Sequence, residues 1–199
     1  MTPIQRVLFA TSNRGKIADV RSIADPTGVK IVAPDEVVDR GTPPEVEEGV
    51  VSYIENAQRK AEAYLRWSGI ASIGDDTGLE VGALGGAPGV ISARYAGDEA
   101  TAQMNTAKLL HELTGVANRA ALFRAVLVLM TPTGEVINAE GELHGTITDA
   151  PRGGGGFGYD NVFEVHGTGK TLAELKESGN GIVTHRHIAL ERLFALLPR

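Results

Sequence analysis

The chain has no cysteine, few aromatic residues and no long hydrophobic run. The absence of cysteine among the 199 residues excludes disulfides, thiolate nucleophiles and thiolate metal sites. The best apolar run covers residues 126–130, which is strand length and far short of the roughly 18 residues that span a bilayer. The first residues turn polar too soon for a signal peptide. We therefore expect a cytoplasmic protein without a membrane partner.

The charge balance is mildly acidic, and the hydrophobic content is that of an ordinary globular chain. The formal net charge is −6, which argues against a nucleic-acid backbone as the main partner. A small anionic ligand is still compatible with this charge, because local basic groups and a metal ion can override a mildly acidic surface. The length fits one domain, or two lobes that share one core.

Strand-like and helix-like patterns alternate along the chain and predict a mixed α/β fold. The expected strands are residues 7–10, 29–33, 70–74, 122–130, 135–147 and 159–165. The first expected helix covers residues 16–24, and a long second helix has one apolar face with Ile54, Ala57, Ala61, Tyr64 and Leu65. A third helix is expected from an Asp98 cap to Leu113. Thr171 and Glu174 are expected to open a short helix, and a last helix is expected after Thr184. No repeat and no linker divides the chain.

Two adjacent acids, Asp75 and Asp76, follow an apolar run that we expect to end at them. A bare turn needs only one such residue, so two neighbouring carboxylates suggest a cation that relieves their repulsion. Glycines at positions 78, 82, 85, 86 and 89 are expected to turn the backbone tightly beside the acids. The plainer alternative is a turn that the two Asp residues cap.

The stretch FATSNRGK, residues 9–16, has the order strand, polar turn and helix start with a lysine. Backbone N–H groups at such a helix start and the ammonium of Lys16 favour an anion. The spacing is not that of a P-loop. The alternative is a plain strand–turn–helix with an exposed lysine.

The stretch PPEVEEG, residues 43–49, supplies acids just before the long helix. Alone, it is typical of a solvated acidic loop. Because that helix leads back to the Asp pair, one of these carboxylates could face Asp75 and Asp76 across a cleft. Such oxygen ligands suit Mg²⁺, which takes one or two carboxylates and completes its shell with water and phosphate oxygens.

Two stretches near the C-terminus could hold a planar ring. In GGGGFGYD, residues 153–160, Phe157 offers a stacking face, although core packing of Phe157 and Tyr159 explains the pattern equally well. In THRH, His185 and Arg186 fall in the first turn of the last helix, where cations oppose the helix dipole. This favours a ligand contact over a solvated basic helix start, and removing Arg186 is then expected to leave stability unchanged or slightly raised.

In this order, the five stretches resemble the inosine/xanthosine triphosphate pyrophosphatase family. The matching blocks are residues 10–16, 47–57 with YIENA, 74–97, GGFGYD and THR. They cover the whole chain, and DDTGLEVGALGGAPGVISARYAG is highly specific. The resemblance implies a single domain over residues 1–199, with an elongated mixed β-sheet flanked by helices in two lobes around a central nucleotide-binding cleft, and a homodimer. It also implies Mg²⁺-dependent hydrolysis of non-canonical purine nucleoside triphosphates (ITP, dITP, XTP) to the monophosphate and pyrophosphate, which keeps them out of nucleic acids.

The resemblance also implies residue roles. Glu48 and Asp76 would hold Mg²⁺, and Asp76 would accept the proton of the attacking water. Thr77 replaces the usual Ser of the family and keeps its hydroxyl. The implied substrate-binding residues are Thr11, Ser12, Asn13, Arg14, Gly15 and Lys16 for the triphosphate, Phe157, Gly158, Tyr159 and Asp160 for the base and sugar, and His185 with Arg186 for the base pocket.

One position departs from the family pattern. The family usually has a lysine five residues before the histidine of the last motif, whereas this chain has Asn180. Lys176, four residues earlier, is the candidate replacement in a rearranged loop. Two other functions stay open: a related nucleotide-sanitising enzyme with another base preference, and a non-catalytic nucleotide sensor. The intact acids argue against the sensor.

Overall fold

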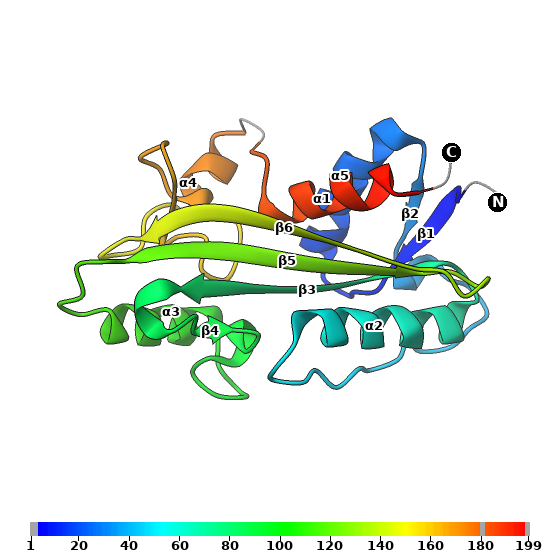
Figure 1. The fold of residues 1–199 in the computed structure, drawn as a ribbon, viewed down its shortest axis with the longest axis horizontal. Helices are drawn as coiled ribbons and strands as arrows, with labels where there is room; N and C mark the ends of the chain where they lie inside the picture. The colour runs from blue at the N-terminus through cyan, green and yellow to red at the C-terminus, as the bar shows by residue number, and fades with distance from the viewer. Residues whose placement is uncertain (1–3, 180–181, 198–199) are drawn as a thin grey trace. The chain divides into compact units, whose positions relative to one another are not determined.

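The structure is a computed structural model, and it describes residues 4–179 and 182–197 (Figure 1). The strands are β1 (Arg6–Phe9), β2 (Lys30–Val32), β3 (Ser72–Val81), β4 (Pro88–Gly89), β5 (Ala120–Met130), β6 (Val136–Ile147) and β7 (Phe163–Val165). The helices are α1 (Arg14–Ala24), α2 (Tyr53–Ser68), α3 (Ala102–Glu112), α4 (Leu172–Glu177) and α5 (His185–Ala195). No helix in these described ranges is long and apolar enough to cross a membrane.

The strands form a mixed sheet in the order β2-β1-β3-β5-β6-β7, with β4 paired to β3. β1 is parallel to both β2 and β3, whereas β4 and β7 pair with their neighbours in antiparallel fashion. The predicted mixed α/β class is therefore confirmed. The chain splits into two compact units: the first comprises residues 1–76, 125–141 and 185–199, and the second comprises residues 77–124 and 142–184.

The core of the first unit follows the alternation of its strands. Val7 and Phe9 on β1 face the same way, because successive strand residues point to opposite faces, and they pack with residues of α1 and α5. Leu8, between them, packs on the other face with Tyr64 of α2. Helices α1 and α5 thus cover one face of this part of the sheet and α2 covers the other (Figure 1).

The core of the second unit gathers around the fully buried Leu79, Phe163 and Leu172. The rings of Phe123 and Phe163 are tilted against each other with centroids 4.6 Å apart. The predicted pairing of Thr171 with Glu174 is confirmed as a capping box that opens α4. This core holds α4 against the glycine stretch at residues 153–156. The backbone of α4 lies so close to Gly153 and Gly155 that a Cβ at either position would clash with it.

The largest correction concerns the Asp pair. β3 does not end at Asp75 but continues through Asp76 and Gly78 to Val81. The prediction of a tight turn beside the acids is therefore wrong. Turns begin only from Gly82 onward. Gly74 lies just before the acids, and a Cβ there would lie 1.9 Å from the carbonyl oxygen of Ala57. This glycine lets the α2 backbone lie directly against β3.

Three smaller predictions were also wrong. α3 begins at Ala102 rather than after Asp98, because the side chain of Thr101 accepts the N–H of Met104 at 3.2 Å and caps the helix. The strand expected at 159–165 shrinks to β7. Ile54 is 40% exposed, because the buried face of α2 is centred on small and polar residues instead.

Candidate active site

Asp75 and Asp76 lie side by side in β3 but serve opposite faces of the strand. Both are buried, with 3% and 5% of their surfaces exposed. Successive side chains of a strand point to opposite faces, and the two carboxylates accordingly have different cationic partners, Lys16 for Asp75 and Lys60 for Asp76. The repulsion of two neighbouring carboxylates is therefore relieved separately on each face.

On the Asp75 face, two cations converge on one carboxylate oxygen. Lys16 Nζ lies 2.7 Å from Asp75 Oδ2, and a guanidinium nitrogen of Arg186 lies 3.3 Å from the same atom. Arg186 and its neighbour His185 are 3% and 6% exposed. The backbone of α5 comes close at this point because Gly141 has no side chain: a Cβ there would lie 2.1 Å from the His185 carbonyl oxygen.

On the Asp76 face, α2 supplies an amide and an ammonium. Asn56 Nδ2 donates to Asp76 Oδ2 at 2.9 Å. Lys60 Nζ lies 3.6 Å from Asp76 Oδ1 and 2.6 Å from Glu48 Oε1, and it donates to the backbone oxygen of Asp75 at 2.9 Å. Asn56 also accepts the N–H of Gly49 at 2.7 Å. The acidic loop at residues 43–49 is thereby tied to the helix that faces the Asp pair.

The surroundings shift the pKa of both Asp76 and Lys60 upward. Burial raises the pKa of Asp76, and Glu48 and Asp75 add to this, against the lowering effect of Lys60 and Asn56. Burial by itself lowers the pKa of Lys60, but the carboxylates of Asp76 and Glu48 raise it by more. Lys60 therefore stays charged at neutral pH. Asp76 becomes a stronger proton acceptor than an ordinary aspartate, as suits a general base.

The donor set fits a hard divalent cation. Oxygens of Glu48 and Asp76 already approach one positive charge, the Lys60 ammonium. Within residues 4–179 and 182–197, no group of three or more His, Cys, Asp or Glu side chains could hold a metal. Two carboxylates are nevertheless what Mg²⁺ typically takes from a protein when phosphate oxygens and water complete its shell. The residues thus fit Mg²⁺ bound together with a phosphorylated ligand.

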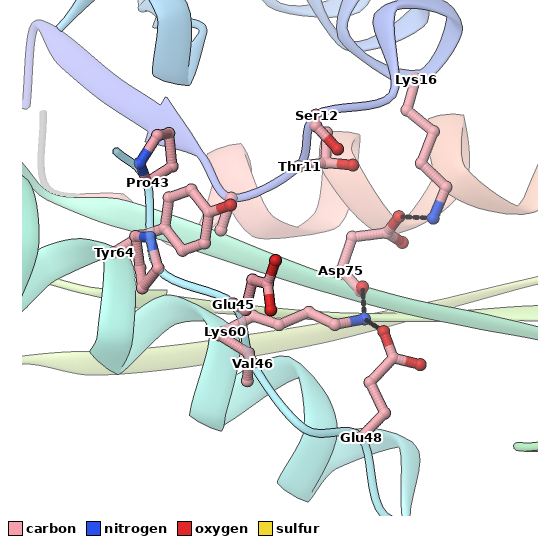
Figure 2. A pocket seen from close by; sticks show the side chains of 12 residues that line it. Thr11, Ser12, Lys16, Pro43, Glu45, Val46, Glu48, Lys60, Tyr64 and Asp75 are labelled. Atoms are coloured by element: carbon pink, nitrogen blue, oxygen red, sulfur yellow. Dashed lines mark hydrogen bonds and ion pairs between the residues drawn. The ribbon is translucent and has the colours of Figure 1, made fainter. Parts of the chain in front are cut away.

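A cavity of about 500 Å³ opens beside these groups (Figure 2). Figure 2 shows Lys16 reaching the Asp75 carboxylate from α1, while Lys60 from α2 lies between Glu48 and the backbone oxygen of Asp75. The cavity is lined by Ala10, Thr11, Ser12, Lys16, Pro43, Pro44, Glu45, Val46, Glu48, Lys60, Tyr64 and Asp75. The turn before α1 and Lys16 in the first turn of this helix border it, and a helix start with a lysine favours an anion.

The glycine stretch of the second unit presents an exposed ring. Phe157 is 46% exposed, whereas Tyr159 is 5% exposed and donates its hydroxyl to the backbone oxygen of Ser92 at 2.8 Å. The core-packing alternative therefore holds for Tyr159 but not for Phe157. Asp160, at 5% exposure, accepts from the N–H of Phe157 at 2.9 Å and lies 2.8 Å from Lys176 Nζ. A cavity of about 170 Å³ runs along residues 153–158.

Comparison with known proteins decides the family. A sequence profile described as the Ham1 family matches residues 7–196. The chain is 42% identical to the dITP/XTP pyrophosphatase of Bacillus licheniformis, over 98% of this chain and 100% of the relative. It is 43% identical to the dITP/XTP pyrophosphatase of Geobacter sulfurreducens, over 94% of each chain. The chain belongs to the Ham1 family.

A solved Ham1 structure extends the likeness to the fold. The Ham1 protein of Staphylococcus aureus superposes with a TM-score of 0.82 at 36% identity, over 96% of each chain. The Ham1 protein of Coxiella burnetii gives a TM-score of 0.84 at 33% identity, over 96% of this chain and 97% of the other. The mixed sheet with flanking helices is therefore the Ham1 fold.

In this Ham1 chain, part of the predicted site comes together in the first unit. Thr11, Ser12, Lys16 and Glu48 line the larger cavity. Asn13 instead caps α1, its side chain accepting the N–H of Lys16 at 3.2 Å, and the side chain of Arg14 is 92% exposed. Gly15 lies in the first turn of α1, Thr77 is half-buried in β3, and Asn180 falls outside the described residues.

The sequence analysis missed Asn56 and Lys60 as site residues. The signal was present, because polar residues at positions 56, 60 and 64 lie one turn apart on the helix face that also buries Ala57 and Ala61. A polar stripe inside an apolar face marks groups that need partners. The partners are Asp76 and Glu48, which only the fold brings near.

The structure tests part of the interpretation of the last motif. His185 and Arg186 open α5 as expected, and both are buried, so the alternative of a solvated helix start is wrong. The contact of these residues with a ligand stays a prediction. The positive charge at this helix start is matched by Asp75, which lies within ion-pair distance of Arg186. Charge pairing with β3 thus offsets the unfavourable position near the helix N-terminus.

Proposed function

We propose that this chain hydrolyses non-canonical purine nucleoside triphosphates such as ITP, dITP and XTP to the monophosphate and pyrophosphate. Two dITP/XTP pyrophosphatases share more than 40% of its residues over nearly their full length. The observation that carries the proposal is the approach of Glu48 and Asp76 to one cationic position, beside a cavity that Lys16 also lines.

In the proposed reaction, a water molecule attacks a phosphorus at the α–β linkage. A new P–O bond forms, the P–O bond of the α–β linkage breaks to give the monophosphate and pyrophosphate, and the water proton passes to the Asp76 carboxylate. Burial raises the pKa of Asp76 in the metal-free chain, which favours this role. Lys16 and Lys60 offset the negative charge of the polyphosphate. Mg²⁺, held by Glu48 and Asp76, would supply further neutralisation of phosphate charge when bound.

We assign the base and sugar to the residues that the family resemblance implies, with one restriction. Phe157 offers a stacking face because it is exposed, whereas the ring of Tyr159 belongs to the core. Discrimination against ATP would come from hydrogen-bond donors directed at a 6-oxo group, since the amino group of adenine would leave such donors unpaired. A homodimer and a cytoplasmic location are part of the same proposal.

A pyrophosphate-release assay tests the function. We expect release from ITP, dITP and XTP to exceed release from ATP and GTP, and to need Mg²⁺. A purified chain that binds ITP but releases no pyrophosphate would support the nucleotide sensor instead. Preference for a different base would place the chain in a related nucleotide-sanitising role.

The metal site has a matched pair of variants within one loop. Glu48→Gln removes a carboxylate that faces Lys60, whereas Glu45→Gln removes one that lines the same cavity without a contact to Lys60 among the described interactions. We expect Glu48→Gln to raise the Mg²⁺ concentration for half-maximal activity about tenfold or more, with little change for Glu45→Gln. Equal shifts would remove Glu48 from the metal site.

A further inference from the structure

Phe157 is held in place by polar contacts rather than by an apolar core. Its side chain is 46% exposed, and it is not among the residues of the second unit's core. Its backbone N–H donates to Asp160 Oδ2 at 2.9 Å. The position of this ring therefore depends on where the Asp160 carboxylate is held.

Lys176 of α4 contacts both the carboxylate and the ring. Its Nζ lies 2.8 Å from Asp160 Oδ2, the same atom that accepts the Phe157 N–H. The same Nζ lies 5.1 Å from the centroid of the Phe157 ring, within the range of a cation–π interaction. One ammonium thus links the buried acid to the exposed ring.

Gly156 shows how closely these groups are packed. A Cβ at this position would lie 2.1 Å from Asp160 Oδ2 and 3.0 Å from Lys176 Cδ, and its φ of +81° is in the left-handed region. Only glycine fits both demands without strain. The carboxylate and the lysine stem therefore lie directly against the loop backbone that carries Phe157.

A second contact from α4 supports the same loop. The N–H of Gly154 donates to Glu177 Oε1 at 2.7 Å, and Glu177 follows Lys176 in α4. The short helix thus holds the glycine loop at two points, one before the ring and one at the ring. A loop with this many glycines would otherwise lose much conformational entropy on ordering.

We propose that Lys176 is a positioning residue that pre-orders Phe157 as the stacking platform for the purine base. The proposal rests on the proposed function for its ligand. Lys176 acts through Asp160 and the ring, not by contact with the polyphosphate. A cation over one face of the ring leaves the other face for a base, and holding the loop in advance reduces the ordering cost of binding.

The first test follows the loop in the protein without ligand. Lys176→Gln removes the charge, and Lys170→Gln is the matched control because Lys170 is exposed in the same unit. We expect amide hydrogen exchange of Phe157 to become several-fold faster in Lys176→Gln, to be normal in Lys170→Gln and to be restored in Lys176→Arg. Unchanged exchange in Lys176→Gln would overturn the positioning role, whatever the substrate.

The second test separates base from phosphate. For Lys176→Gln we expect the dissociation constant of inosine monophosphate and the KM for ITP to rise about threefold to fivefold, with kcat and the inhibition constant of inorganic pyrophosphate unchanged. In a Phe157→Ala background the substitution should have no further effect. Weaker pyrophosphate inhibition would overturn the proposal, because it would place Lys176 at the phosphates. If the wild-type chain does not hydrolyse ITP, the proposed function fails, while the exchange test still decides whether Lys176 orders the loop.

Discussion

The two units of the chain arrange their charged groups in different ways. In the first unit, the partners of Asp75 and Asp76 come from helices α1, α2 and α5, which lie far apart in the sequence. In the second unit, Phe157, Asp160 and Lys176 lie within one short stretch of chain and contact one another. The first arrangement depends on the whole core, whereas the second depends on one helix and one loop.

This difference suggests a division of labour. Buried charges that several elements hold in place suit chemistry on a polyphosphate, because they need no reorganisation when charge develops. An exposed ring on a glycine loop suits recognition, since a few local contacts decide whether it is ordered. Substitutions of the buried charges around Asp75 and Asp76 should therefore affect turnover and stability, and those around Phe157 should affect affinity for the base.

The largest effect is expected at Asp76. Asp76→Asn keeps the shape of the side chain but removes the proton acceptor, so turnover of ITP should fall by at least about a hundredfold. Asp149→Asn is the control, because the side chain of Asp149 is 96% exposed. For each variant, steady-state pyrophosphate release measures turnover and a circular dichroism spectrum shows whether the chain is folded. A folded Asp76→Asn variant with near-normal turnover would remove Asp76 from the mechanism.

Arg186 should matter for stability as well as for the site. Arg186→Ala removes a cation that lies within ion-pair distance of the buried Asp75, and breaking a buried ion pair costs about 3 kcal/mol or more. We expect a lower melting temperature, which replaces the sequence-based expectation of unchanged or raised stability. Arg192→Ala, at an exposed position of α5, is the control. Equal melting temperatures for Arg186→Ala and the wild type would show that Asp75 does not need the Arg186 ion pair for stability.

A smaller effect concerns the titration of Asp76 in the metal-free protein. Lys60 lowers the pKa of Asp76 against the dominant effect of burial, so Lys60→Met should raise that pKa further. A group with a raised pKa contributes stability at low pH that is lost as the pH rises through the folded-state pKa. As the pH rises from the unfolded-state pKa to the folded-state pKa of Asp76, the free energy of unfolding should therefore fall more in Lys60→Met than in the wild type. Carboxyl ¹³C NMR measures the pKa, and an unchanged or lower value would contradict this account.

Some features of the site follow from local sequence and others do not. The helix start beside Lys16, the capping box of α4 and the placement of His185 at the start of α5 could be predicted, because each depends on a few neighbouring residues. The continuation of β3 through two acids could not, since the cations that meet the two carboxylates on opposite faces of this strand come from other elements.

The partners of Asp75 and Asp76 could not be predicted from the sequence either. Arg186 lies 111 residues from Asp75 in the sequence, and Lys60 lies on a different element from Asp76, so no local pattern pairs them. Asn56 looked like one more polar residue of a helix, and only the close approach of α2 to Gly74 makes it a partner of Asp76. The mixed sheet was predictable from pattern, whereas charge pairing across it required the fold.

The division of labour is tested most directly by one calorimetric comparison of Lys16→Ala with Phe157→Ala. Each variant is titrated with inorganic tripolyphosphate and with inosine monophosphate in the presence of Mg²⁺. We expect Lys16→Ala to weaken tripolyphosphate about tenfold or more and inosine monophosphate far less, whereas Phe157→Ala should weaken only inosine monophosphate. Equal losses of both ligands in both variants would contradict the assignment of the phosphates to Lys16 and of the base to Phe157.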